Sequence, residues 1–250
     1  MKIFNLIIAL SLLTFSACKP EEPVVDPPTT SGVSLTMKFS PKFKGTPISW
    51  AMAYVNSSAD TMSFDKVKYI MSNFVLEKEN GELFYIPDGY AFLSLKDGRD
   101  SVVFKNLPTG NYKSVRFTVG LDSVVNHSDP ASRALDHPLS PSLNEMHWGW
   151  AGGYIFNIVE GYYKNNGANA AFSYHVALEK NSRTHSFVET YKMDKNSRMV
   201  FDIHLDKYFD NVITFGIKKD GAYSHSADVD PVMDKFIQNM NGIFEFVSFK

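Results

Sequence analysis

The stretch at residues 67–86, VKYIMSNFVLEKENGELFYI, contains two apolar segments on either side of Asn80-Gly81. An Asn-Gly pair between apolar runs is the strongest short-range signal for a tight hairpin turn, because both residues tolerate positive φ angles. We therefore expect two antiparallel strands here, at residues 67–77 and 83–86. The hairpin predicts a fold in which strands that follow one another along the chain pair as a meander.

Apolar residues recur at every second position through most of the remaining chain, which is the periodicity of a half-buried strand. The segments with this pattern are 35–39, 48–54, 101–104, 115–119, 154–159, 172–178, 187–193, 199–205 and 243–249. Short strands separated by Pro- and Gly-containing turns, such as LPTGNY at 107–112, are typical of a sandwich. We therefore predict a mainly β fold, an antiparallel β-sandwich with a Greek-key-like meander.

Two features interrupt the strand pattern. A short C-terminal helix is predicted after Asp230, a good N-cap residue, with Pro231 at its first position. The apolar residues of this helix share one face and are Val232, Met233, Phe236, Ile237 and Met240. The second feature is a long segment between Val119 and Tyr154 without periodicity, and a loop of this length inside a compact domain is usually functional.

The N-terminus predicts export and lipidation. Residues 1–17 form a basic start and a short apolar run that ends in Ser16-Ala17, and Cys18 follows as the only cysteine of the chain. This is the pattern of a lipoprotein signal peptide, so we expect a lipidated Cys18. Residues 18–32 are rich in proline and acids and predict a flexible tether, with the folded domain at 33–250. The expected location is the outer membrane or cell surface, with the periplasmic face as an alternative.

Composition and motifs argue against several functions. The formal net charge is −2 with scattered Lys and Arg, so no footprint for nucleic acid is present. The chain contains no nucleophile elbow, phosphate-binding glycine loop or dinucleotide fingerprint. Cysteine-based metal sites are excluded by the single, predicted lipidated cysteine. We therefore expect a binding protein rather than an enzyme.

Four segments resemble successive signature segments of the MbnP-like family of exported copper-binding proteins, first associated with methanobactin operons. They are VKYIMSNFVLEKENGELF, LPTGNYKSVRFTVGLDSVVN, ALDHPLSPSLNEMHWGWAGGYIFNIVEG and FSYHVAL. The most specific element consists of Leu135, Asp136, Met146, Trp148, Trp150, Gly153, Tyr154, Glu160 and Gly161. Glu145 departs from the pattern, since the family carries glycine before the methionine.

The resemblance implies a particular copper chemistry. In the family, a tryptophan of such a motif is oxidised to kynurenine by a di-haem peroxidase-like partner of the MbnH type, and the product joins histidines in binding copper. Trp148 or Trp150 would be that residue here. An unmodified indole offers a metal no lone pair, whereas kynurenine exposes an aryl amine and a ketone.

The residues themselves rank the other candidate ligands. His175 lies opposite the apolar face of its strand beside Ser173 and Ala177, where a ligand or a solvent-facing polar residue would both fit. His225 lies in a polar loop, and the resemblance implies that it is the second candidate, because the corresponding segment of the family tends to carry His-Ser. Met146 suits copper(I) through its thioether, although core packing is an alternative.

Lower-ranked positions complete the predicted site. Asp122 could orient a ligand imidazole or cap a turn, and His147 is expected to point away from the tryptophans. His204 is expected on a solvated strand face. The loop histidines are expected at the surface, and they are His127, His137 and His185.

Two other functions remain open from the sequence. One is a glycan- or peptide-binding surface lipoprotein in which aromatic side chains form a stacking platform without metal. The platform residues would be Trp148, Trp150, Tyr154 and Tyr162. The other is a purely structural domain in which the tryptophan pair pins the long loop to the core.

Overall fold

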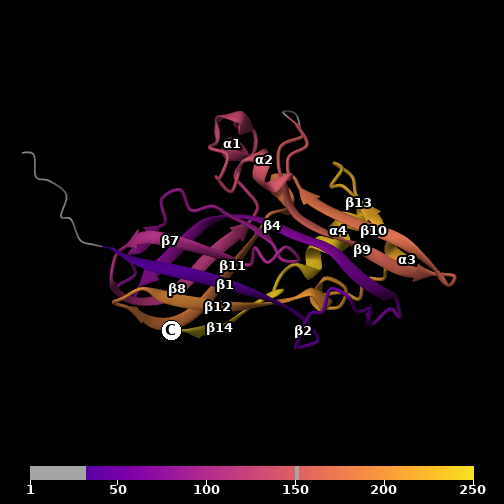
Figure 1. Cartoon of the computed structure of the whole chain (residues 1–250), viewed down its shortest axis with the longest axis horizontal. Coiled ribbons are helices and arrows are strands. Elements are labelled where there is room, and N and C mark those ends of the chain that lie inside the picture. The colour runs from indigo at the N-terminus through magenta and orange to yellow at the C-terminus, as the bar shows by residue number, and fades with distance from the viewer. Residues whose placement is uncertain (1–31, 150–151) are drawn as a thin grey trace, which may run out of the picture. The chain divides into compact units, whose positions relative to one another are not determined.

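The computed structural model describes residues 32–149 and 152–250. Cys18, the predicted signal peptide, nearly all of the predicted tether, and Trp150 therefore lie outside the described residues. The described chain forms a β-sandwich of one five-stranded and one nine-stranded sheet (Figure 1). This confirms the predicted mainly β class.

The five-stranded sheet has the order β14-β12-β1-β2, with β7 also paired to β1. Its strands are β1 (Val33–Phe43), β2 (Thr46–Pro47), β7 (Ser101–Leu107), β12 (Ser197–His204) and β14 (Phe244–Phe249). The pairing of β1 with β12 is parallel, whereas the other pairs in this sheet are antiparallel.

The nine-stranded sheet has the order β11-β8-β4-β9-β10-β13, and β3, β5 and β6 also pair with β4. Its strands are β3 (Tyr54–Val55), β4 (Thr61–Lys78), β5 (Leu83–Tyr85), β6 (Ala91–Ser94), β8 (Gly110–Val119), β9 (Ile155–Asn165), β10 (Ala168–Ala177), β11 (Arg183–Met193) and β13 (Tyr223–Ser224). The short edge strand β13 runs parallel to β10, and the other pairs are antiparallel.

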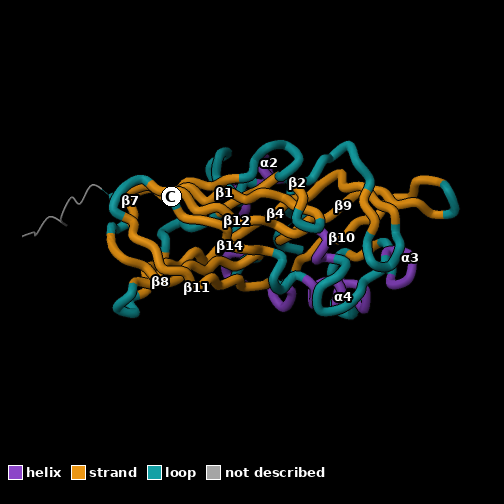
Figure 2. Tube along the Cα trace, turned by 90° about the horizontal axis from the view of Figure 1, so that it is seen from below, coloured by secondary structure: helices purple, strands orange, loops and turns teal. Residues whose placement is uncertain are grey.

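Short helical segments connect the strands (Figure 2). They are α1 (Ser123–Asn126), η1 (Pro130–Ser132), α2 (Pro141–Asn144), η2 (Glu179–Asn181), η3 (Leu205–Tyr208), α3 (Ile217–Asp220) and α4 (Pro231–Asn239). Among the described residues, no helix has the length and apolar character needed to cross a membrane.

The predicted hairpin is present as β4 and β5. Leu83 pairs with Glu77 across the turn, and the amide of Glu82 donates to Asn80 Oδ1 at 3.0 Å. Gly81 has a φ of +88°, a conformation that glycine adopts without steric cost. The turn residues thus set the register of the strand that organises the whole nine-stranded sheet.

The core consists of aromatic side chains from both sheets. Phe39 and Phe201 stack within the five-stranded sheet at 5.3 Å between ring centroids. Across the sandwich, Phe117 of β8 meets Phe39 at 5.8 Å and Phe244 at 5.2 Å in edge-to-face arrangements. Such pairs add about 0.5–1.5 kcal/mol each beyond the burial of their area.

The predicted C-terminal helix is confirmed as α4. Asp230 Oδ1 accepts from the amide of Met233 at 2.9 Å, which caps the helix as expected. Phe236 stacks on Tyr174 of β10 at 4.5 Å and on Tyr208 at 5.0 Å. The apolar face of α4 therefore covers one face of β10 and leaves the opposite face available for other residues.

Two sequence expectations about local structure are wrong. Residues 48–54 do not form the predicted strand, because a turn closes there with the Met52 amide donating to Ser49 O, and Met52 is exposed. His185 is not a surface loop residue but lies buried in β11. Its ring centroid is 4.7 Å from that of Phe244, and its Nε2 is buried with no hydrogen-bond partner in the part of the chain that the structure describes.

The burial of His185 predicts an acid-sensitive stability. Burial lowers its pKa from 6.5 to about 4, so between these values the unfolded chain binds a proton that the native chain does not. The free energy of unfolding should fall as the pH drops through this window and then level off. His185→Phe should lose less stability than the wild type in urea titrations from pH 7 to pH 4; equal losses in both proteins would contradict the assignment.

Candidate metal centre

Strand β10 places His175 on the side of the nine-stranded sheet opposite to α4. Phe172, Tyr174 and Val176 are buried, in agreement with the predicted alternation. His175 points the other way, and 14% of its side chain is exposed. The strand thus presents an imidazole at the outer face with little contact with water.

Glu160 of β9 holds the His175 ring in place. The Nε2 of His175 lies 2.6 Å from Glu160 Oε1, and Lys66 of β4 binds the second carboxylate oxygen at 3.0 Å. The hydrogen bond from His175 and the ion pair with Lys66 lower the pKa of Glu160 to about 2. A carboxylate only accepts, so His175 Nε2–H donates to it, and Nδ1 is the ring nitrogen left for another partner.

The free nitrogen of His175 is the exceptional atom of this site. Its Nδ1 is buried and has no hydrogen-bond partner among the described residues. Buried polar atoms in native proteins are nearly always partnered, and an exception requires an explanation such as an ion. A histidine whose second ring nitrogen is fixed by a carboxylate is also the common arrangement of metal-binding imidazoles.

His225 is brought next to His175 by the edge strand β13. Tyr223 and Ser224 pair with Ser173 and Tyr174 of β10 in parallel register. Ser226 then donates its hydroxyl to the carbonyl of His175 at 2.8 Å and accepts from the amide of Ala177 at 2.9 Å. The backbone on both sides of His225 is therefore attached to β10.

The two imidazoles are close enough to share a ligand. Their ring centroids are 4.7 Å apart at an interplanar angle of 79°. Burial, together with the proximity of His175, lowers the pKa of His225 below its ordinary value. His225 is therefore neutral at physiological pH, and a neutral imidazole keeps a lone pair for a metal.

Trp148 of the long loop completes what we call the His–Trp cluster, which consists of Trp148, His175 and His225. The indole centroid lies 6.2 Å from His175 and 6.4 Å from His225. The amide of Trp148 donates to Gly153 O at 3.0 Å, which closes a turn at the loop tip. The side chain is 41% exposed, so it is accessible to a second protein.

The Gly152-Gly153 pair is required by close approaches at this turn. A Cβ on Gly152 would lie 2.9 Å from Trp148 Cβ, and one on Gly153 would lie 2.7 Å from the side chain of Asn126. Asn126 is fully buried and accepts from the amide of Tyr154 at 2.7 Å. Its amide group also donates to Glu179 at 2.9 Å. Helix α1 thus anchors the loop that carries Trp148.

The other predicted site residues have structural contacts. Met146 is fully buried and belongs to the hydrophobic core, which favours its packing role. His147 stacks edge-on against Tyr154 at 4.5 Å, and its Nδ1 accepts from the amide of Gly149. Asp122 caps α1 by accepting from Val125 N at 3.0 Å and makes no hydrogen bond to a histidine within the described chain.

The predicted aromatic platform does not form as expected. Tyr154 is fully buried and its hydroxyl donates to Leu139 O at 2.7 Å, so it cannot stack on a ligand. Tyr162 and Trp148 are exposed, whereas Trp150 lies outside the described residues. Tyr154 is therefore not part of an exposed aromatic platform, and the described residues contain no such platform for a glycan or peptide.

Sequence reasoning missed the roles of Glu160 and Lys66. The sequence places Glu160 in a motif without indicating its contact with a histidine, and it gives no signal for Lys66. Lys66 pairs with Glu160 in the β4–β9 register, and Glu160 pairs with Ser173 in the β9–β10 register. No group of three or more His, Cys, Asp and Glu side chains suited to a metal occurs within residues 32–149 and 152–250.

The geometry defines a class of protein, a β-sandwich with two imidazoles and an indole gathered on one sheet face. The chain belongs to the MbnP family, whose model matches residues 32–226. The solved structure of MbnP from Methylosinus trichosporium is similar, with a TM-score of 0.54 and 16% sequence identity over 85% of this chain and 97% of that chain. At this identity the likeness shows a shared fold. A comparison with curated proteins found no match.

Proposed function

We propose that this chain is an exported, lipid-anchored protein that binds copper through His175, His225 and a kynurenine formed from Trp148. The family to which it belongs is associated with methanobactin and with copper. The proposed role is acquisition, storage or trafficking of copper rather than catalysis. The lipid anchor would be Cys18 at the start of the proline-rich tether.

The observation that carries the proposal is the Nδ1 of His175, which has no partner among the described residues and lies beside a second imidazole. The hydrogen bond from Nε2 to Glu160 orients the ring and raises the basicity of the free nitrogen. Imidazole-rich sites bind copper more tightly than the other divalent first-row metals. The residues present therefore fit a copper ion that takes nitrogen ligands from both histidines.

The proposed oxidation would supply the missing donor. Conversion of tryptophan to kynurenine cleaves the C2–C3 bond of the indole and places one oxygen on each carbon. Hydrolysis then releases the C2 carbon as formate and leaves an aryl amine and a ketone. The oxidant in the proposal is two equivalents of hydrogen peroxide, activated by a di-haem peroxidase-like partner of the MbnH type. Each equivalent accepts two electrons, delivers one oxygen atom and is reduced to water. The exposed edge of Trp148 would give such a partner access.

Mass spectrometry of the protein from its own host tests this chemistry. We expect peptides across residues 143–164 to show a loss of one carbon and a gain of one oxygen at Trp148, because this indole faces both imidazoles. Trp50 packs against the core and is the internal control that should remain unmodified. Fragment ions that place the change on Trp150, or an unmodified peptide from copper-limited and copper-replete cells, would refute the role of Trp148.

A further inference from the structure

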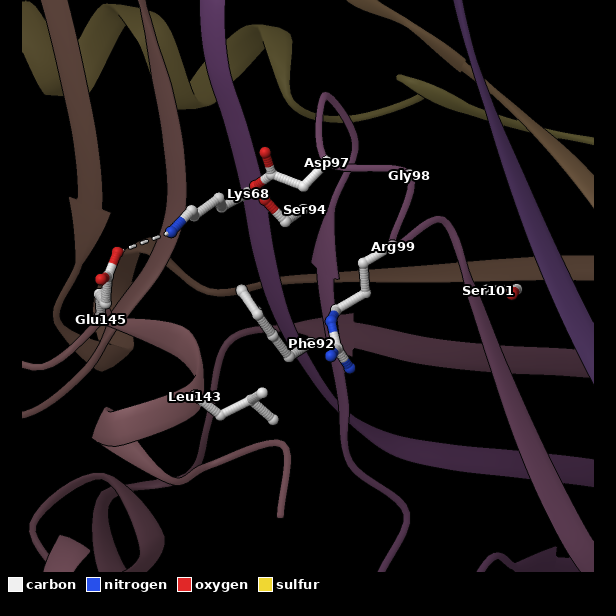
Figure 3. A pocket seen from close by; sticks show the side chains of 9 residues that line it. All are labelled: Lys68, Phe92, Ser94, Asp97, Gly98, Arg99, Ser101, Leu143 and Glu145. Carbon is white, nitrogen blue, oxygen red and sulfur yellow. Dashed lines mark hydrogen bonds and ion pairs between the residues drawn. The ribbon is translucent and has the colours of Figure 1, made fainter. Parts of the chain in front are cut away.

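A polar pocket of about 550 Å³ lies at strands β4 and β6 of the nine-stranded sheet (Figure 3). Lys68 of β4 contributes its floor, and Phe92 and Ser94 of β6 line it next to Lys68. Lys68 pairs with Ile158 of β9, which in turn pairs with His175 of β10. The pocket is thus one strand away from the His–Trp cluster and shares no lining residue with it.

Within the described residues, the ammonium group of Lys68 makes only long polar contacts. Only 9% of this side chain is exposed, yet its two polar contacts, Asn144 O and Glu145 Oε2, are both at 3.3 Å. Charge-assisted N–H···O bonds are normally about 2.7–2.9 Å long. Desolvation of a cation is costly unless a closer partner is available. The floor of the pocket is therefore suited to an anionic group.

Arg99 is a second cation of the pocket, and like Lys68 it lies near the ring of Phe92. The Cζ of Arg99 lies 5.5 Å from the centroid of Phe92, and Lys68 Nζ lies 5.7 Å from it. In the described part of the chain, the Arg99 side chain makes no hydrogen bond or ion pair. Figure 3 shows the guanidinium directed along Phe92 rather than toward an acid. A planar guanidinium without a partner is suited to bind a carboxylate through two hydrogen bonds.

Two acids line the same pocket and balance these charges. Asp97 accepts from Ser94 Oγ at 2.5 Å, and the side chain of Glu145 is 79% exposed. Glu145 has a φ of +56°, a left-handed conformation that favours glycine. The chain therefore carries a carboxylate at this position even though the backbone conformation is unfavourable for it. Two cations and two acids disfavour a polyanion such as phosphate and match a ligand with one charge of each sign. Leu143 adds an apolar wall.

We infer that this pocket binds a small zwitterion with the chemistry of a free amino acid that has an apolar side chain. Its carboxylate binds Lys68 and Arg99, its ammonium group binds Asp97 and Glu145, and its side chain contacts Leu143. The inference is independent of copper, because none of these groups belongs to the His–Trp cluster.

Calorimetric titration of the full-length protein with L-leucine tests the inference. A metal chelator is present, so that complexes of copper with the amino acid contribute no heat. We expect saturable binding of leucine and at least about tenfold weaker binding of isocaproate, which lacks the ammonium group, and of isoamylamine, which lacks the carboxylate. No binding of leucine, or tighter binding of inorganic phosphate than of leucine, would overturn the proposal.

Variants separate this pocket from the neighbouring site. Arg99→Gln and Asp97→Asn change exposed side chains, so both proteins should fold, and each should weaken leucine binding by about tenfold or more. Lys78→Met removes a cation from the same strand outside the pocket, where Lys78 pairs with Glu82, and is the matched control that should leave leucine binding unchanged. Unaltered affinity in Arg99→Gln would overturn the assignment of the carboxylate.

Discussion

Copper binding is expected to be lost in His175→Ala, by ~100-fold or more in affinity, because the variant removes a buried imidazole nitrogen that has no partner among the described residues. Glu160→Gln should reduce the affinity by about ten- to hundredfold, since the amide orients the ring less strongly and no longer makes its free nitrogen more basic. Competition titration against a copper chelator measures both losses on protein purified from its own host.

His204→Ala is the matched control for this experiment. The Nε2 of His204 binds Glu245 at 2.7 Å, and 12% of its side chain is exposed, so it resembles His175 in both respects. It lies in the other sheet, and no other histidine or tryptophan ring stacks near it within the described residues. Copper affinity should therefore be unchanged in His204→Ala. Equal losses in His204→Ala and His175→Ala, or full affinity in His175→Ala, would exclude the proposed site.

Gly161→Ala is expected to destabilise the fold severely. A Cβ at this position would lie 2.0 Å from the carbonyl oxygen of Ser63 and 2.9 Å from the ring of Phe172. The nearest atom belongs to the backbone of the adjacent strand β4, where a β-bulge interrupts the pairing with β9 between Phe64 and Lys66. Relief of the clash requires separation of the two strands. We expect a loss of at least about 3 kcal/mol in the free energy of unfolding.

Gly167→Ala distinguishes this collision from ordinary glycine strain. Gly167 has a φ of +85° in the turn between β9 and β10, and a Cβ there would meet nothing within 4 Å. Its replacement should cost only about 1 kcal/mol, from the conformation of the backbone. Urea unfolding monitored by circular dichroism compares the two variants. A similar, small loss in both would show that β4 and β9 separate more easily than their contact indicates.

The strand pattern could be predicted from the sequence wherever one face of a strand is buried. The alternation at Met199, Phe201 and Ile203 produced a correct strand, because these side chains all face the core. The alternation at residues 48–54 did not, because a turn replaces the strand pairing there. The prediction that His185 lies at the surface was wrong for a related reason. Histidine is a polar residue, but the packing of β11 against Phe244 buries this side chain.

The assignment of strands to the two sheets could not be predicted from the sequence. The turn after Leu107 was expected to join two strands, and it does, but β7 pairs with β1 in one sheet and β8 pairs with β4 and β11 in the other. The parallel pairing of β1 with β12 joins residues far apart in the chain. Such pairings are set by contacts between distant segments rather than by local propensity.

The sequence by itself determined the β class, the Asn80-Gly81 hairpin, helix α4 and the outward direction of His175, because local turn chemistry and side-chain periodicity decide these features. Only the tertiary structure decided that Glu160, Lys66 and His225 surround His175 and that Trp148 faces both imidazoles. Those neighbours come from β9, β4, the segment after β13 and the long loop, and strand register with buried hydrogen bonds such as those of Ser226 and Asn126 brings them together.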